Sequence, residues 1–257
     1  MNGNPALRQR YEQVLGRLRQ ACESAGRAPD SVRLLAVSKA QPASQVLELA
    51  ALGQRAFGEN YLQEALDKIA ACRDEWSAAA PGGPLAWHFI GPIQSNKTRP
   101  IAAHFDWVHS VEREKIAHRL SEQRPEGLGT LDVCLQVNVS GEASKSGAAP
   151  GETLALALAV AALPRLRLRG LMAIPEPTDD VNLQRARFAA LRELHARVKA
   201  ALDGEAARCF DTLSMGMSAD LEAAVAEGAT IVRIGSALFG ERSMRSPLPA
   251  SPLSSST

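Results

Sequence analysis

The sequence predicts an α/β protein: a single (β/α)8 TIM-type barrel with an extra N-terminal helix and no second β domain. Short apolar segments alternate with longer amphipathic segments along the chain, which implies parallel strands joined by right-handed helical crossovers. The strand-like segments number eight, and 257 residues is a typical length for this barrel. An open doubly wound sheet would normally carry GxGxxG after its first strand, but this chain has SKAQP at 38–42.

The elements follow one another in a regular order. A helix opens the chain near 5–26 and is ended by Gly26 and Pro29. The first strand, 33–38, is apolar almost throughout, as expected of a strand covered on both faces. Later apolar runs predict strands at 55–58, 86–90, 107–110, 131–139, 166–173, 210–214 and 230–235. The longer stretches between them predict helices near 43–52, 60–79, 95–103, 112–123, 151–163, 182–202 and 218–227, with a final short helix at 236–242.

The domain organisation is expected to be simple. No linker and no internal repeat divides the chain, so we expect one barrel domain over 1–242. Residues 243–257 are rich in Pro and Ser, which predicts a disordered tail.

Composition excludes several classes of function. Lys and Arg number 29 against 28 Asp and Glu, so the chain has no basic footprint for nucleic acid or for a membrane surface. The four cysteines show no metal-ligand or disulfide spacing, which favours a reduced, cytoplasmic setting. No apolar leader and no membrane-length apolar run is present in the sequence. We expect a monomer without a metal site, and with small or mixed partners.

Lys39 is the first residue that points to chemistry. It follows an apolar strand, and it shares a face with Leu35 and Val37. Near the other end of the chain, Arg233 shares a face with Ile231 on the eighth strand. If both faces point inward, two cations approach one pocket, which is costly unless an anion or a neutral amine is present.

A neutral amine attacks carbonyl groups, so Lys39 is a candidate for Schiff-base formation with an aldehyde. The structural alternative is that Lys39 extends from the strand end into water.

The loops after the seventh and eighth strands predict a phosphate site. The segment LSMGMSAD, 213–220, places small residues and hydroxyls before a helix, and Gly235 and Ser236 open a short helix after the eighth strand. These two loops and a helix N-terminus form the recurring phosphate site of this barrel. Each loop alone is also compatible with ordinary turn and capping chemistry.

A lysine that condenses with an aldehyde, together with a phosphate cradle, suggests pyridoxal 5′-phosphate as the cofactor. The eighth strand would place Arg233 near the ring nitrogen. A guanidinium cannot protonate that nitrogen, so the ring would be a weaker electron sink than one paired with a carboxylate. This argues against demanding carbanion chemistry.

Several motifs together resemble one known family. They are AVSKAQP, FGENYLQEA, WHFIGPIQSNK, VNVSGEASKSG, GLMAIP, LSMGMSADLEAAVAEGAT and VRIGSALFG. In this order they closely resemble the YggS/PROSC family of pyridoxal phosphate homeostasis proteins over nearly all of 5–242. That family is similar to the N-terminal barrel of bacterial alanine racemase and lacks the second, β-rich domain of that enzyme.

The resemblance implies roles for individual residues. Lys39 would carry the cofactor as an internal aldimine, and Arg233 would face the pyridine nitrogen. The remaining residues implied in cofactor binding are Ser214, Met217, Gly235 and Ser236 at the phosphate, Asn60 and Met172 along the ring, and His88 in a family motif at the pocket. This chain departs from the commoner family pattern at Ala40, Gln41 and Ser236, and Ser236 keeps the hydroxyl of the more frequent Thr.

The resemblance and the residues together predict a carrier without substantial catalysis and without catalytic residues, which serves pyridoxal phosphate homeostasis and passes the cofactor to apo-enzymes. The alternative is a cofactor-dependent amino-acid racemase. Racemisation needs a second base, commonly a tyrosine, and the only tyrosines are Tyr11 and Tyr61. A third possibility is a lysine-dependent aldolase acting on a sugar phosphate. The other histidines, His104, His109, His118 and His195, show no metal-ligand spacing and are expected to be surface or structural residues.

Overall fold

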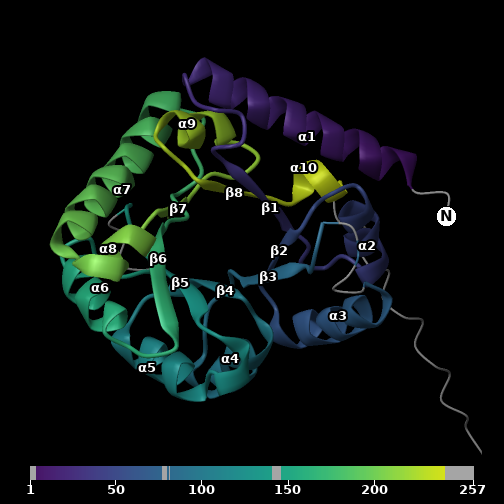
Figure 1. The fold of residues 1–257 in the computed structure, drawn as a ribbon. Coiled ribbons are helices and arrows are strands. Elements are labelled where there is room, and N and C mark those ends of the chain that lie inside the picture. The colour runs from purple at the N-terminus through teal and green to yellow at the C-terminus, as the bar shows by residue number, and fades with distance from the viewer. Residues whose placement is uncertain (1–3, 77–79, 81, 141–145, 241–257) are drawn as a thin grey trace, which may run out of the picture.

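Eight parallel strands close into a barrel, and helices cover its outside (Figure 1). The computed structural model describes residues 4–76, 80, 82–140 and 146–240. The strands are β1 (Arg33–Val37), β2 (Ala56–Glu59), β3 (Ala86–Phe89), β4 (Trp107–Val111), β5 (Leu131–Gln136), β6 (Leu166–Met172), β7 (Thr212–Ser214) and β8 (Ile231–Ile234). Each strand pairs with its sequence neighbours, and β1 pairs with β8 to complete the ring. The predicted fold class is confirmed.

The helices alternate with the strands as predicted. They are α1 (Pro5–Ser24), α2 (Ala43–Ala51), α3 (Leu62–Glu75), α4 (Thr98–His104), α5 (Glu114–Gln123), α6 (Thr153–Ala161), α7 (Val181–Ala201), α8 (Gly204–Cys209), α9 (Leu221–Ala226) and α10 (Ser236–Phe239). Two short 3₁₀ turns, η1 (Ser95–Lys97) and η2 (Glu126–Leu128), complete the described elements. The boundary predicted at 242, the tail 243–257 and the end of the helix predicted over 60–79 lie outside the described residues.

Two differences from the prediction occur together before β7. The strand predicted at 210–214 begins at Thr212, and the unpredicted helix α8 precedes it. Phe210 is the C-cap of α8, and its backbone N–H donates to the carbonyl of Ala206. The apolar Phe210 is therefore buried as the end of a helix and not as the start of a strand.

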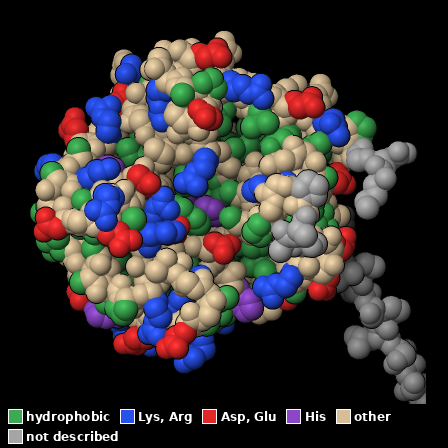
Figure 2. Space-filling model, in the orientation of Figure 1, with side chains coloured by type: hydrophobic (Ala, Val, Ile, Leu, Met, Phe, Trp, Pro, Cys, Tyr) green, Lys and Arg blue, Asp and Glu red, His purple; other side chains and the backbone are tan. Residues whose placement is uncertain are grey.

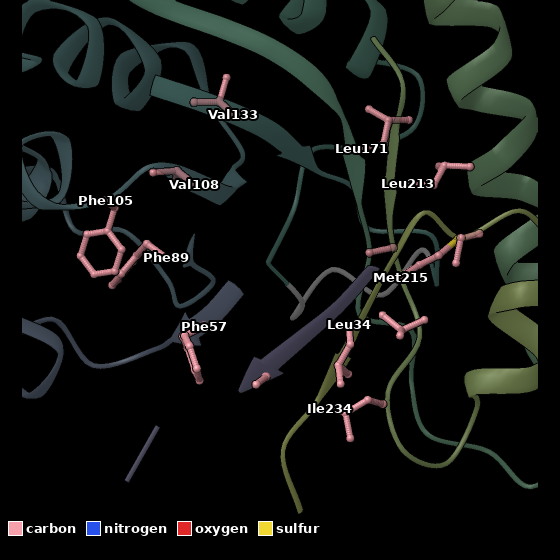
Figure 3. Packing of buried hydrophobic residues seen from close by; sticks show 14 of the residues in the cluster. Leu34, Phe57, Phe89, Phe105, Val108, Val133, Leu171, Leu213, Met215 and Ile234 are labelled. Carbon is pink, nitrogen blue, oxygen red and sulfur yellow. The ribbon is translucent and has the colours of Figure 1, made fainter. Parts of the chain in front are cut away.

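The strands separate two apolar layers. Figure 3 shows members of the outer layer, such as Leu34, Phe57 and Ile234, which pack between the barrel and the helices. The inner layer fills the barrel with Leu35, Val37, Ile90, Trp107, Cys134, Met172 and Ile231. Side chains alternate along a strand, so the inward parity expected for β1 and β8 is confirmed.

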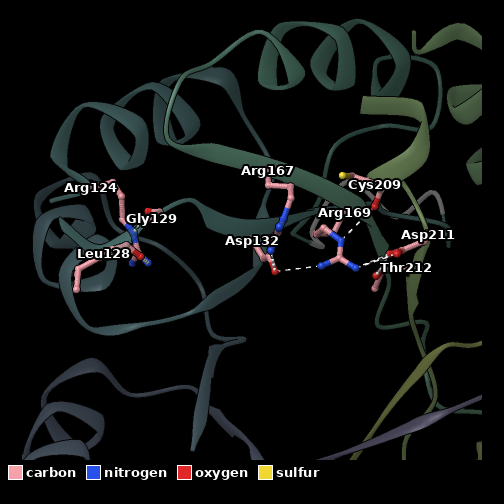
Figure 4. A network of polar contacts seen from close by, with 9 residues as sticks. All are labelled: Arg124, Leu128, Gly129, Asp132, Arg167, Arg169, Cys209, Asp211 and Thr212. Carbon is pink, nitrogen blue, oxygen red and sulfur yellow. Dashed lines mark hydrogen bonds and ion pairs between the residues drawn. The ribbon is translucent and has the colours of Figure 1, made fainter. Parts of the chain in front are cut away.

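An ion-pair network closes the barrel at the amino-terminal ends of the strands (Figure 4). Arg169 donates to Asp132 at 3.1 Å and to Asp211 at 2.8 Å, and Arg167 also pairs with Asp132. The guanidinium carbons of Arg33 and Arg169 lie 5.5 and 4.8 Å from the ring centroid of Trp107. The carboxyl ends of the strands, at the opposite end of the barrel, are therefore the candidate for a ligand site, as in other barrels of this kind.

Helix α1 lies across the outside of the barrel over α9 and α10 (Figure 1). Leu7, Val14 and Leu18 bury its inner face. Arg10 Nε donates to the carbonyl of Leu238 at 2.7 Å, and Arg17 pairs with Glu222. The N-terminal helix thereby supports the helices that follow β7 and β8.

The face seen in Figure 2 carries acidic and basic side chains interspersed, with no large area of one sign. None of the helices in the described part of the chain has both the length and the hydropathy needed to cross a membrane.

Candidate functional site

Most of the predicted site residues gather at one end of the barrel. Lys39 and Asn60 come just after β1 and β2, and Met172 and Ser214 are the last residues of β6 and β7. The others are His88 in β3, Arg233 in β8, and Met217, Gly235 and Ser236 in the segments that follow β7 and β8. The carboxyl ends of parallel strands in a closed barrel share one rim, so the topology brings most of this set together. His88 is the exception, because it lies inside the barrel against Trp107, whose ring contacts Arg33 and Arg169.

Arg233 is a buried cation inside this end of the barrel. Its side chain is 4% exposed, and its Nη1 donates to the carbonyl of Ser214 at 2.6 Å and to the hydroxyl of Ser214 at 2.9 Å. Its Nη2 donates to the carbonyl of Ala173 at 2.9 Å. Burial lowers the pKa of the guanidinium to about 10, so it stays protonated at neutral pH. These bonds use three of the five N–H groups and leave two for a further acceptor.

A chain of polar side chains crosses the barrel from Arg233. Ser214 Oγ lies 2.8 Å from His109 Nδ1, and His109 Nε2 lies 2.8 Å from His88 Nδ1. His88 stacks on Trp107 with ring centroids 5.3 Å apart. His109 is fully buried and was expected only to be a surface or structural histidine. Its link to Ser214 joins residues 105 positions apart, and no local spacing could have shown it.

Burial keeps both histidines neutral. It lowers the pKa of His88 to about 3, with a smaller effect from Arg33. It also lowers the pKa of His109 well below its ordinary value, with further lowering from His88, Arg233 and Arg33. Two neutral imidazoles and a serine hydroxyl therefore form a polar but uncharged support beside the Arg233 guanidinium.

Ser214 is placed differently from the other residues predicted at the phosphate. Its side chain is fully buried, and its hydroxyl contacts Arg233 and His109. In this position the hydroxyl orients Arg233, and a direct contact with phosphate stays a prediction.

The segments after β7 and β8 are ordered by local caps. The backbone N–H of Met217 donates to Asp220 Oδ1 at 2.6 Å. Gly235 precedes α10, and a Cβ built there would lie 3.3 Å from the carbonyl oxygen of Val37. The first backbone N–H groups of α10, beginning at Ser236, have no partner within the helix and can bind an anion.

Asn60 and Lys39 occupy neighbouring strand ends. Asn60 Oδ1 is buried and has no hydrogen-bond partner among the described residues. Lys39 is half-buried in a turn after β1, and the backbone N–H of Gln41 closes that turn on the carbonyl of Ser38 at 3.0 Å. In the β1–β8 register Leu35 lies opposite Arg233, so Lys39 is four residues further toward the rim.

Comparison with known proteins gives the family. The family model described as "Alanine racemase, N-terminal domain" matches residues 13–243. The pyridoxal phosphate homeostasis protein of Pseudomonas aeruginosa is 63% identical over 234 residues, which cover 91% of this chain and 95% of that protein. The chain belongs to the pyridoxal phosphate homeostasis protein family. The resemblance expressed by the seven motifs is thus confirmed.

Solved structures agree with this family and with the fold. PipY of Synechococcus elongatus was solved with pyridoxal phosphate (PLP) bound. It is 38% identical with a TM-score of 0.72, and the match covers 87% of this chain and all of that chain. A protein from Bifidobacterium adolescentis is 35% identical with a TM-score of 0.82, and the match covers 91% of this chain and 94% of that chain.

The residues at the rim fit pyridoxal phosphate as a ligand of this family. The unpartnered Asn60 Oδ1 and the two remaining N–H groups of Arg233 offer polar contacts inside a largely apolar barrel. Lys39 supplies an amine at the same rim, and the start of α10 supplies backbone N–H groups. An aldehyde, an aromatic nitrogen and a phosphate are complementary to these groups.

Proposed function

We propose that this protein binds pyridoxal 5′-phosphate and serves its homeostasis, with Lys39 as the attachment point. The main support is the buried Arg233 guanidinium, which is held by three hydrogen bonds on the strand adjacent to the one that leads into Lys39. The sequence identity of 63% with the Pseudomonas aeruginosa protein, and of 38% with PLP-bound PipY, supports the same ligand.

Each residue has a defined task in this proposal. The amine nitrogen of Lys39 condenses with the cofactor aldehyde and releases one water molecule. Arg233 donates an N–H to the ring nitrogen and leaves it unprotonated. The phosphate is bound near Met217, Gly235 and Ser236. The remaining predicted contacts are Asn60 and Met172 along the ring, and His88 and Ser214 in the polar chain that supports Arg233.

We further propose that the protein is a carrier without substantial catalysis, present in the cytoplasm as a monomer, and that apo-enzymes receive the cofactor from it. Tyr11 is 6% exposed within α1, on the outer side of the barrel, which is unsuited to an acid or base at the rim. The unprotonated ring nitrogen in this arrangement also disfavours carbanion formation.

One observation favours the racemase alternative. Tyr61 directly follows Asn60 and is 55% exposed, so a phenol lies near the rim. Incubating the loaded protein with L-alanine in heavy water distinguishes the two functions. A carrier leaves the α-hydrogen in place, whereas exchange at ordinary enzyme rates would establish a racemase or a related enzyme.

The attachment point is tested by borohydride reduction after incubation with pyridoxal phosphate, followed by peptide mapping. We expect a phosphopyridoxyl group on the peptide that contains Lys39, and loss of the visible absorbance in Lys39→Ala with an unchanged circular dichroism spectrum. An unmodified Lys39 peptide in the wild-type protein would contradict the assignment.

A further inference from the structure

A second lysine lies buried behind the turn that carries Lys39. Lys68 comes from α3, and its side chain is 4% exposed. Its Nζ lies 2.7 Å from the carbonyl oxygen of Ser38, 2.7 Å from Glu59 Oε1 and 2.9 Å from Glu64 Oε1. An ammonium group has three N–H donors, and all three are used.

The same two carboxylates bind the turn directly. Ser38 Oγ donates to Glu59 Oε1 at 2.6 Å, and the backbone N–H of Ala40 donates to Glu64 Oε1 at 2.6 Å. The residues on both sides of Lys39 are therefore connected to Lys68. Ser38 accepts a hydrogen bond from Lys68 directly, and Ala40 is connected to it through the Glu64 carboxylate.

This turn needs support, because Ala40 has a φ of 60°, in the left-handed region. A residue other than glycine is strained in that conformation, because its Cβ comes too close to the following carbonyl oxygen. Hydrogen bonds to charged partners are stronger than those between neutral groups, so the bonds to Glu64 and Lys68 can hold the turn. Without this support, the flanking backbone would relax and the direction of the Lys39 side chain would change.

We propose that Lys68 is a positioning residue, which together with Glu59 and Glu64 holds the turn 38–40 so that Lys39 points its amine at the bound aldehyde. This inference rests on the proposed function. Lys68 does not react itself, since each of its N–H groups already has an acceptor. Its contribution is to the formation of the covalent bond, and not to binding of the ring or the phosphate.

Two ligands separate these contributions. Pyridoxal 5′-phosphate can form the covalent bond, whereas pyridoxine 5′-phosphate has the same ring and phosphate but an alcohol in place of the aldehyde. In Lys68→Met we expect the dissociation constant of pyridoxal phosphate to rise about tenfold, or about 1.4 kcal/mol. We expect the dissociation constant of pyridoxine phosphate to change by less than about twofold, within about 0.5 kcal/mol. We also expect slower formation of the borohydride-trapped adduct on Lys39.

A double variant distinguishes positioning from stability. Lys68→Met leaves Glu59 as a buried carboxylate without its cation, which lowers the melting temperature. Lys68→Met/Glu59→Gln removes that charge and should recover much of the stability, but Ser38 still lacks its donor. We therefore expect weak pyridoxal phosphate binding to persist in the double variant. Recovery of wild-type affinity together with stability would overturn the proposal.

Glu64→Ala tests the other side of the turn if Lys68→Met does not fold. The Glu64 side chain is 36% exposed, so its removal is tolerable, and the Ala40 N–H loses its acceptor. We expect a roughly threefold selective loss of pyridoxal phosphate affinity, the size of one hydrogen bond. Equal losses for both ligands would overturn the proposal.

Asp132→Asn is the matched control, because it disrupts a buried ion pair at the opposite end of the barrel. It should lower stability without a selective rise in the dissociation constant of pyridoxal phosphate over that of pyridoxine phosphate. A selective rise in this control, similar to that in Lys68→Met, would overturn the proposal. If the wild-type protein forms no adduct on Lys39, the proposed function fails, and this inference fails with it.

Discussion

Ser214 shows how a single hydroxyl connects two parts of the site. It accepts from Arg233 and contacts His109, while the carbonyl of the same residue accepts a second N–H from Arg233. Buried polar groups without partners cost free energy, so each member of this chain depends on the next.

Ser214→Ala should lower the affinity for pyridoxal phosphate by about 0.5–1.5 kcal/mol, because Arg233 loses one of the bonds that orient it. Titration of the visible absorbance measures this change. Ser121→Ala is the control, since Ser121 is also buried but donates to the Pro164 carbonyl away from the rim. An unchanged dissociation constant in Ser214→Ala would exclude an orienting role for the hydroxyl.

The two neutral histidines make stability depend on pH. Their pKa values are lowered in the folded state, to about 3 for His88 and well below the ordinary value for His109. The unfolded chain therefore binds more protons below about pH 6.5, and the free energy of unfolding falls as the pH falls. Between pH 7 and pH 5, each histidine should lower the free energy of unfolding by about 2 kcal/mol.

His109→Gln should remove one such contribution, so its stability should fall less steeply between pH 7 and pH 5 in urea titrations. Carboxyl groups with a raised pKa, such as Glu59, also change the stability with pH, but they do so equally in the wild type and in the variant. His118→Gln is the control, because the His118 side chain is 48% exposed on α5. Equal slopes for the wild type and His109→Gln would show that His109 becomes protonated in the folded protein.

At the scale of elements, the loops after β2 and β3 pack against each other at the rim. A Cβ added to Gly91 would lie 2.2 Å from the carbonyl oxygen of Asn60, a backbone atom that cannot move alone. Glycine at this position permits the close approach of the two loops, and the approach positions Asn60.

Gly91→Ala should destabilise the protein by about 1–3 kcal/mol, the usual cost of overpacking, and should weaken ligand binding because Asn60 is displaced. Gly16→Ala is the control within α1, where a Cβ meets no atom within 4 Å. It should stabilise the protein by about 0.5–1 kcal/mol, as expected for glycine to alanine in a helix. Denaturant titration of both variants measures these changes, and a neutral Gly91→Ala would contradict the packing argument.

Helices and strands were predicted where the periodic pattern of apolar residues was long. Helix α8 was not predicted, because it depends on contacts with distant residues. Helix α8 has six residues, too short for a clear periodic pattern. Its last carbonyl, from Cys209, accepts from Arg169 Nε at 3.1 Å. That cap comes from β6, 40 positions away, and is invisible to local inspection.

At the scale of the whole molecule, α1 connects the start of the chain to its last described helix. Arg10 donates to the carbonyls of Leu238 and Phe239 at the end of α10, while Ser236 lies at the start of α10. The N-terminal helix thereby supports the segment proposed to bind phosphate, although it lies outside the barrel.

Arg10→Met should lower the free energy of unfolding by about 1.5–3 kcal/mol, since it removes charged hydrogen bonds to partly buried carbonyls. Arg19→Met, at an exposed position of α1, is the control and should change stability by less than about 0.5 kcal/mol. Equal effects in thermal unfolding would show that the α1–α10 contact contributes nothing beyond general surface charge.

The sequence by itself determined the barrel, its strand order and the rim at which most of the candidate site residues gather. These features follow from local apolar periodicity and from the shared direction of parallel strands. The positions of Lys39 after β1, Arg233 within β8 and Gly235 after β8 required no more than that.

Only the tertiary structure decided which residues contact Arg233 and the turn that carries Lys39. Local sequence patterns assigned His109 and Lys68 no role in the candidate site, and they could not show that the Ser214 hydroxyl contacts Arg233. Their partners come from other strands and helices, because closure of the barrel brings distant segments within hydrogen-bond distance. Periodicity reports which face of an element is buried, but it carries no information about which buried polar groups meet.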